Sequence, residues 1–202
     1  MSEKIIIDIY RKKTLDDIAE ILSSKDSKLE TGSSSAITAL LASSLVKRGA
    51  EIINVSNPSE RVEYIIRNSE KLMEYMYFLI DEDVKCRGPL KRALSEESRE
   101  HIEACLQPAA AICSEIVNMM QTLLGFNSEL CGFVTGNAPH YLAEAAEYSM
   151  ASIKASISYI YSIAAMSEDD TFAYVTRREN EIAFQEAEKV YKSIMSGFNL
   201  PF

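Results

Sequence analysis

The sequence predicts an all-α fold, a multi-helix bundle with long central antiparallel helices that form one domain over residues 1–202. Apolar and small residues recur at steps of three and four from near the N-terminus to near the C-terminus, which is the period of an α-helix. Breaks rich in Gly, Pro and Ser divide this pattern into long segments. Hydrophobic residues make up 47% of the 202 residues, enough for one sizeable core.

The first predicted helix is short and begins after Thr14. Thr14 is a typical N-cap residue, and Asp16 and Asp17 follow it in the first turn, where negative charge favours a helix. The apolar stripe of this helix consists of Ile18, Ile21 and Leu22. The preceding Ile5–Ile7 run fits a strand or a helix equally well.

The second and third helices are predicted on either side of a turn at residues 57–60. Gly32 and three serines lead into the second helix, where Ser35, Ala39 and Ser43 would permit a close backbone approach by another helix. Pro58 lies near the start of the third helix. That helix is long, and we expect it to end near Gly88-Pro89, before a linker.

Three more helices are predicted in the second half of the chain. Residues 95–98 form a capping-type start for the fourth, in which Pro108 should kink the helix or split it at Gln107. The fifth begins near Ala138-Pro139 and is crowded with small residues, which suits the centre of a bundle. The sixth runs from about 167–170 to Gly197, and the tail 199–202 is expected to be frayed or loosely docked.

Charge and composition exclude several classes of protein. The formal net charge of −9 repels phosphate backbones and anionic lipids, so neither nucleic acid nor a membrane is an expected partner. The longest apolar stretches are interrupted before the span of about 20 residues that a bilayer needs, and no leader opens the chain. We therefore expect a cytoplasmic protein. Its four cysteines form no CxxC pair, and with only two histidines present they predict free thiols and no metal site.

The first candidate site is the segment Thr31-Gly32-Ser33-Ser34-Ser35 at the start of the second helix. Exposed amides and the positive end of the helix dipole could hold an anion there. The alternative is a plain flexible loop that ends in a serine cap.

The second candidate is Asp83, which falls on the apolar stripe of the third helix together with Met76, Leu79 and Cys86. Burial raises the pKa of a carboxyl group toward the range useful for proton transfer, whereas a nearby cation lowers it again. The alternative is an acid at the edge of the stripe, solvated or paired with Lys85 or Arg87.

The third candidate is the break that contains Gly136 and Asn137, between the fourth and fifth helices. Asn137 could cap the fifth helix or form a hydrogen bond with a ligand amide, and capping is the simpler explanation. The lone histidines His101 and His140 are better explained as surface or core residues than as catalysts.

The order of these features resembles the formiminotetrahydrofolate cyclodeaminase and methenyltetrahydrofolate cyclohydrolase family. A serine-and-glycine loop opens an Ala/Ser-rich helix, a long helix ends in LIDEDVKC, a helix carries an internal proline in CLQPAAAICSEI, and a Gly-Asn break precedes a second small-residue helix. The resemblance runs from about Thr14 to about Ala187.

The resemblance implies an all-helical homodimer that binds a one-carbon tetrahydrofolate at or near the subunit interface, without a metal or redox cofactor. The reaction would expel ammonia from formiminotetrahydrofolate to close the methenyl ring, or hydrolyse that ring. Asp83 would be catalytic, moving the proton to the leaving amine. The substrate-binding residues would be Gly32, Ser33, Ser34, Ser35, Gly136 and Asn137.

The sequence also departs from the family pattern. The family loop resembles PTPGGGS, whereas this chain has LETGSSS, which places side chains where a ligand would approach the backbone. The small-then-Phe pair after the acid is Cys86-Arg87, and the Ser-Asp pair downstream of Gly-Asn falls near Leu142-Ala143. A non-catalytic dimeric scaffold or ligand-binding protein that has lost the active site is therefore the alternative. An open cleft lined by residues 32–35 (the serine turn), Asp83 and Asn137 would favour the enzyme, whereas a filled cleft would favour the alternative.

Overall fold

The computed structural model describes residues 10–134 and 136–198, and these residues form an all-α fold, as the sequence predicts. The Ile5–Ile7 run and the tail 199–202 lie outside the described residues. The elements in chain order are a 3-10 helix Tyr10–Lys12, α1 (Leu15–Ser23), α2 (Thr31–Ser56), α3 (Glu60–Ser95), α4 (Arg99–Leu130), a 3-10 helix Cys131–Phe133, α5 (Ala138–Met166) and α6 (Asp170–Gly197).

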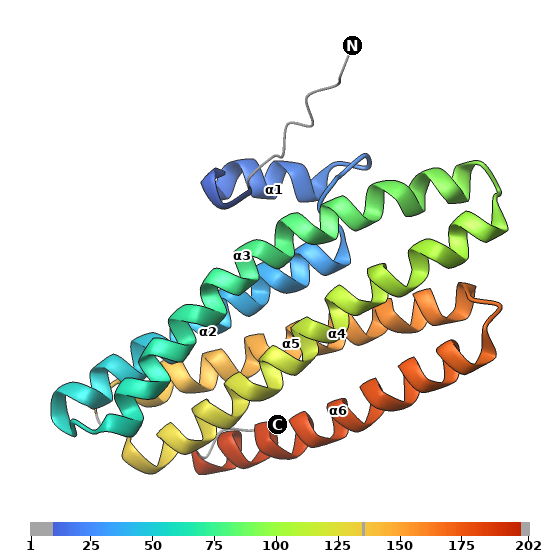
Figure 1. The fold of residues 1–202 in the computed structure, drawn as a ribbon. Coiled ribbons are helices and arrows are strands. Elements are labelled where there is room, and N and C mark those ends of the chain that lie inside the picture. Colours follow the sequence, from blue (N-terminus) through green and yellow to red (C-terminus); the bar gives the residue numbers. More distant parts are fainter. Residues whose placement is uncertain (1–9, 135, 199–202) are drawn as a thin grey trace.

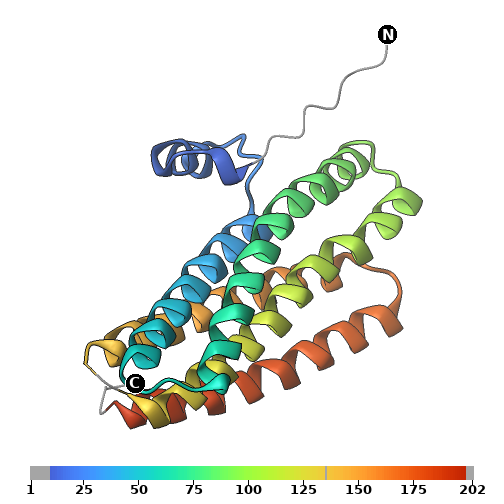
Figure 2. The same ribbon diagram turned by 60° about the vertical axis from the view of Figure 1, so that its left-hand side comes forward.

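Helices α2 to α6 run up and down in an elongated antiparallel bundle, with α1 set against its outside (Figure 1). The view in Figure 2 shows that α2 begins partway along the bundle, beside the middle of α3, while α3, α4, α5 and α6 extend further. The start of α2 is therefore surrounded by other helices instead of lying at an end of the molecule. This position determines the environment of the candidate site.

Side chains at the predicted starts cap three of the helices. Thr14 forms a reciprocal capping box with Asp17 at α1, and Ser59 accepts a hydrogen bond from the Val62 amide at α3. Asp169 accepts hydrogen bonds from the amides of Thr171 and Phe172 in the first turn of α6. These caps satisfy donors that have no partner inside their own helix.

The described residues contain neither of the two helix breaks that were predicted at prolines. Helix α3 continues through Gly88 and Pro89 to Ser95, so the predicted linker is helical, and α4 is not split at Pro108. Leu90 next to Pro89 and Leu106 near Pro108 are buried in one cluster between α3, α4 and α5. Packing of these side chains outweighs the hydrogen bond that each proline removes.

Small residues allow α2 and α5 to pack closely, as the sequence predicts. Ala39 and Ser43 of α2 and Ser149 of α5 are fully buried. A Cβ atom added to Gly49 would lie 2.8 Å from a methyl carbon of Leu142, so glycine is needed for this contact. The buried hydroxyls of Ser43 and Ser149 donate to carbonyls one turn earlier in their own helices, so they enter the core with hydrogen-bond partners.

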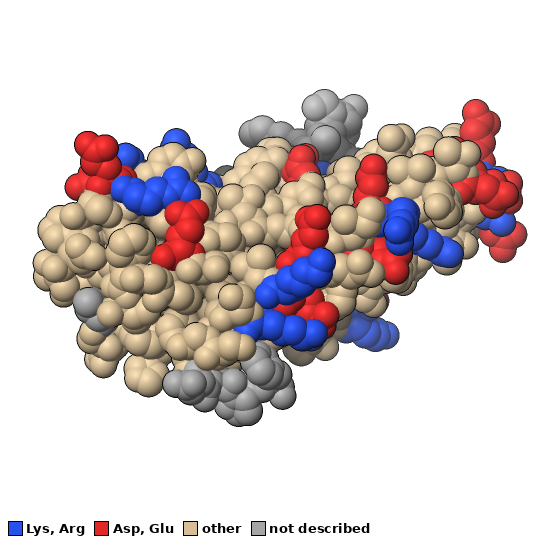
Figure 3. All heavy atoms as spheres, turned by 90° about the horizontal axis from the view of Figure 1, so that it is seen from below, with Lys and Arg blue, Asp and Glu red and all other residues tan. Residues whose placement is uncertain are grey.

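The helical segment Arg99–Phe133 is long and apolar enough to cross a bilayer by length and composition. In the bundle 56% of its most apolar window is buried against other helices, which is also the behaviour of a core helix in a soluble protein. On the face shown in Figure 3, acidic and basic side chains are interspersed among uncharged ones, so this face has no patch of a single sign.

Candidate active site

Asp83 is buried at the middle of the bundle and contacts the serine turn directly. Its side chain lies on α3 and only 1% of the residue is exposed. The backbone N–H and the hydroxyl of Ser33 both donate hydrogen bonds to Oδ2 of Asp83, at 2.7 and 2.6 Å. Two residues that are fifty positions apart in the sequence are thus joined by two short bonds inside the core.

Asp83 acts as the cap of helix α2 from outside that helix. Glu30 occupies the N-cap position, but its side chain forms no capping hydrogen bond. The Ser33 amide belongs to the first turn, where amides have no partner within the helix, and the positive end of the helix dipole points toward the carboxylate. The predicted loop 31–35 is therefore the first turn of α2, and Asp83 has a structural role whether or not it is catalytic.

Gly32 makes the close approach of Asp83 possible. A Cβ atom at Gly32 would lie 2.2 Å from Oδ1 and 2.5 Å from Cγ of Asp83. Both distances are far below normal van der Waals contact, so any larger residue would push the carboxylate away from the helix start. The glycine is required for space and not for an unusual backbone angle.

Arg87, one helical turn after Asp83, covers the carboxylate. Its Nε lies 3.4 Å from Oδ1 of Asp83, and its Nη1 donates to Oε2 of Glu30 at 2.8 Å. The guanidinium carbon lies 3.7 Å from the centroid of the Tyr159 ring. Arg87 is only 8% exposed, whereas the Glu30 side chain is 27% exposed and also pairs with Lys91 at the surface.

The uncharged side chains around this cluster are poor nucleophiles. Burial raises the pKa of the Cys113 thiol to about 12, and the charge of Asp83 adds to the effect. Burial also raises the pKa of the Tyr159 hydroxyl, which the charge of Arg87 opposes. Both groups stay protonated near neutral pH, so the chemistry available here is proton transfer and hydrogen bonding, not attack by a thiolate.

The other serines of the predicted loop do not contact Asp83. The Ser34 hydroxyl donates to the Thr31 carbonyl within the first turn, and Ser34 is half-buried. The Ser35 hydroxyl is buried without a hydrogen-bond partner in the part of the chain that the structure describes, while its carbonyl accepts from Ser152 of α5. Of the loop, only Gly32 and Ser33 meet the acid.

Gly136 and Asn137 lie away from Asp83, near the second half of α2. Gly49 in the second half of α2 contacts Ala138 and Leu142, whereas Ser35 contacts Ser152, so α2 and α5 are antiparallel. The fourteen residues from Ser35 to Gly49 correspond to about 20 Å of helix. Within one chain, the structure does not bring Gly136 and Asn137 to the serine turn.

Asn137 also does not cap its own helix by a side-chain bond. It occupies the N-cap position of α5, but the side chain forms no capping hydrogen bond. Gly136 has a φ of +54°, the left-handed conformation that glycine adopts without strain. The left-handed backbone in the break between α4 and α5 therefore explains why this position is glycine. The Asn137 side chain remains available for another contact.

Sequence reasoning missed two residues of the Asp83 cluster. The spacing of Asp83 and Arg87 at i and i+4 indicated their pairing, but no local pattern pointed to Glu30 or Tyr159. Glu30 reaches the cluster because α2 begins directly after it, and Tyr159 because α5 runs antiparallel to α2. Only the tertiary arrangement brings them together.

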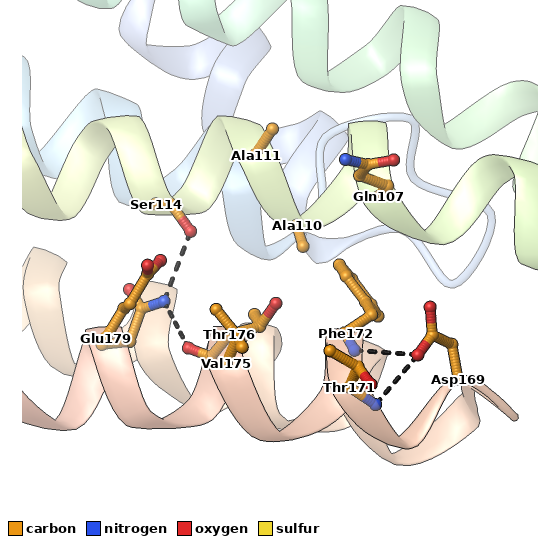
Figure 4. Close-up of a pocket in the computed structure, with 11 residues that line it drawn as sticks. Gln107, Ala110, Ala111, Ser114, Asp169, Thr171, Phe172, Val175, Thr176 and Glu179 are labelled. Atoms are coloured by element: carbon orange, nitrogen blue, oxygen red, sulfur yellow. Dashed lines mark hydrogen bonds between the residues drawn. The ribbon is translucent and has the colours of Figure 1, made fainter.

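A separate groove lies between α4 and the first half of α6 (Figure 4). It has a volume of about 430 Å³, and Ala110 and Ala111 of α4 leave room opposite Phe172 of α6. None of the predicted site residues lines it. Among residues 10–134 and 136–198, no group of three His, Cys, Asp or Glu side chains is arranged to hold a metal ion.

The antiparallel all-α chain matches the model of a known protein family over most of its length. The family model described as formiminotransferase-cyclodeaminase matches residues 14–182. This chain therefore belongs to the formiminotransferase-cyclodeaminase family, and its membership supports a role in folate one-carbon chemistry.

One solved structure shows the same fold over nearly the whole chain. The crystal structure of formiminotetrahydrofolate cyclodeaminase from Thermotoga maritima superposes with a TM-score of 0.88, covering 94% of this chain and 97% of that chain. The sequence identity is 16%, so this likeness concerns the fold. A comparison with curated proteins gave no match.

Proposed function

We propose that this protein is an enzyme that acts on a one-carbon derivative of tetrahydrofolate, as a cyclodeaminase or a methenyltetrahydrofolate cyclohydrolase. The family match over residues 14–182 carries this proposal, because it spans the serine turn, Asp83 and the Gly136-Asn137 break together. We further propose that the enzyme works in the cytoplasm without a metal or redox cofactor. The net charge of −9 argues against nucleic acid and membranes as partners.

Both reactions need a group that moves a proton. In the cyclodeaminase reaction, the ring-closing nitrogen loses a proton and bonds to the formimino carbon, and the departing nitrogen gains a proton and leaves as ammonia. In the cyclohydrolase reaction, water adds to the methenyl carbon and one ring carbon–nitrogen bond breaks. Asp83 is the proposed proton carrier, and the donors around it, Ser33 and Arg87, suit an ionised carboxylate that first accepts a proton.

The proposed site is shared between two chains of a homodimer. Within one chain Asn137 lies near the second half of α2, away from Asp83, so we propose that the two approach the same reacting group from different subunits. In such a dimer, the serine turn and Asp83 of one chain would face Gly136 and Asn137 of its partner. Light scattering that gives a monomer at micromolar concentration would contradict the arrangement.

Subunit complementation tests this arrangement directly. An Asp83→Asn variant and an Asn137→Ala variant, each inactive alone, would be unfolded, mixed in equal amounts and refolded. Random pairing should restore about a quarter of the native activity, since half of the dimers would hold one intact site of two. If the mixture refolds to native dimers but recovers no activity, then Asp83 and Asn137 either belong to the same subunit's site or do not share a site.

The family activity itself is tested by turnover of formiminotetrahydrofolate and of methenyltetrahydrofolate, followed spectrophotometrically. Ligand at a hundred times its Kd should add about 2.7 kcal/mol of stability, which is a rise in Tm of roughly 5–11 °C for a chain of this size. No turnover by the native chain, together with no folate-dependent rise in Tm, would remove the proposal.

The role of Asp83 needs its own matched control. Asp83→Asn keeps the size of the side chain but removes its charge, and we expect it to abolish turnover. Glu82→Gln changes a neighbouring acid that pairs with Lys85 at the surface, and should leave turnover unchanged. Full activity in a folded Asp83→Asn variant would show that the family is right and the assigned catalyst wrong.

One observation favours the second candidate function, a non-catalytic scaffold or ligand-binding protein. Ser33 and Arg87 surround Asp83, which is 1% exposed, so within a single chain the carboxylate contacts protein groups instead of an open cleft. A protein of this kind would bind a folate, with the same rise in Tm, and show no turnover of either substrate. Calorimetry of folate binding beside the turnover assay separates the two candidates.

A further inference from the structure

The guanidinium of Arg87 lies in a niche that contacts it from three sides. Asp83 pairs with Nε, Glu30 pairs with Nη1, and the ring of Tyr159 lies against the guanidinium plane. The three groups come from α3, from the residue before α2, and from α5. Arg87 and Asp83 lie one turn apart on α3, whereas Glu30 and Tyr159 come from other parts of the chain.

These contacts recognise a chemical class and not only a positive charge. Two carboxylates supply charge and accept N–H bonds, while an aromatic face favours a flat, delocalised cation. A guanidinium satisfies both demands, and so does an amidinium, in which two nitrogens share the charge across one carbon. An ammonium ion can also lie over an aromatic face, but it has no flat fork of N–H donors that can meet both carboxylates while its plane lies on the ring. Tetramethylammonium has no N–H donor at all, and a metal ion has none either.

Arg87 does not satisfy the niche completely. Its Nη2 is buried without a hydrogen-bond partner among the described residues, and so is the hydroxyl of Tyr159. A buried polar atom without a partner is costly, so two of them in one cluster point to an occupant that is not the best fit. A cation that took the place of Arg87 could donate an N–H bond to the Tyr159 oxygen, which Arg87 leaves without a partner.

The niche has a route to solvent on the side of Glu30. The Arg87 side chain is 10% exposed, Glu30 is 27% exposed, and Lys91 beyond it is 56% exposed. Lys91 pairs with the same carboxylate and can keep Glu30 neutralised when Arg87 leaves. The long Arg87 side chain can therefore move outward over Glu30 while Asp83 and Tyr159 stay in place.

We propose that the niche formed by Asp83, Glu30 and Tyr159 is a binding site for planar amidinium cations, and that Arg87 occupies it as a built-in competitor. The formimino group is an amidine carbon bound to two nitrogens, so the link to catalysis rests on the proposed function. In that case Arg87 must leave the niche before the formimino group can approach Asp83. The binding site itself requires no folate.

The test uses Arg87→Ala and two small cations, formamidinium and methylguanidinium, supplied as chlorides at millimolar concentration. Each should raise the Tm of Arg87→Ala in a saturable way, by roughly 3–6 °C at ten times its Kd. Sodium chloride and tetramethylammonium chloride at equal ionic strength should not. The wild-type protein should not respond, because its niche is filled.

A double variant supplies the matched control. Arg87→Ala combined with Asp83→Asn keeps the vacated space but removes the anchoring carboxylate, so the response to both cations should be lost. If Arg87→Ala does not fold alone, refolding with formamidinium should recover its far-UV circular dichroism. An equal response to sodium, a response that survives the double variant, or no recovery on refolding would overturn the proposal. None of these measurements uses folate, so a failure of this proposal can be distinguished from a failure of the proposed enzyme activity.

Discussion

Replacing Gly32 with alanine probes the contact on which the candidate site depends. The new Cβ would lie 2.2 Å from Oδ1 of Asp83, whereas ordinary contacts to a Cβ begin at about 3.4 Å, so the carboxylate must move by about 1 Å. The carboxylate has little free space, since Ser33 and Arg87 hold it and 1% of the residue is exposed. The hydrogen bonds from Ser33 must therefore lengthen beyond their useful range.

The expected loss follows from those two bonds. Each hydrogen bond to a charged group contributes about 1.5–3 kcal/mol, and alanine returns at most about 1 kcal/mol through its higher helix propensity. We expect a net destabilisation of roughly 3 kcal/mol, which is a fall in Tm of roughly 6–12 °C for a domain of this size.

Denaturation in urea followed by far-UV circular dichroism measures this change, with Gly125→Ala as the matched control. Gly125 lies inside α4, and a Cβ there meets no atom within 4 Å, so alanine should stabilise the protein by about 0.5–1 kcal/mol. A Gly32→Ala protein as stable as the wild type, with an unchanged slope of unfolding against urea, would refute the close packing of Asp83 on the start of α2.

Three further predictions concern single groups. Asp169→Ala should cost about 1 kcal/mol in urea denaturation, because it removes the side-chain cap of α6; no change would show that the cap is not formed in solution. The pKa of about 12 for Cys113 predicts that this thiol is the last of the four cysteines to react with an alkylating agent at mildly alkaline pH, and early labelling found by mass spectrometry would contradict its burial. The hydrogen bonds from Arg61 lower the pKa of Glu129 below 4.5, so this pair adds stability above about pH 4.5 that is lost as the pH falls through the folded-state pKa. In Glu129→Gln, the free energy of unfolding should therefore fall less steeply as the pH is lowered below about 4.5. The same fall in the variant and the wild type would exclude the pair.

The local pattern of the sequence was sufficient for the helices and for most of their starts. Caps such as Thr14, Ser59 and Asp169 act within four residues of themselves, so they can be read without knowledge of the fold. The predicted end of the third helix near Pro89 and the predicted split at Pro108 were wrong for a related reason. The cost of Pro89 and Pro108 is local, but the burial of Leu90 and Leu106 that outweighs it comes from neighbouring helices.

The sequence by itself determined that Asp83 falls on an apolar stripe with a cation one turn away, because helical periodicity places residues three and four apart on one face. Only the tertiary structure decided that this stripe packs on the first turn of α2, so that Ser33 binds the acid and Glu30 and Tyr159 enclose Arg87. It also decided that Asn137 lies near the second half of α2, away from Asp83. These contacts join segments far apart in the chain, and their geometry depends on the packing of whole helices, which no short stretch of sequence encodes.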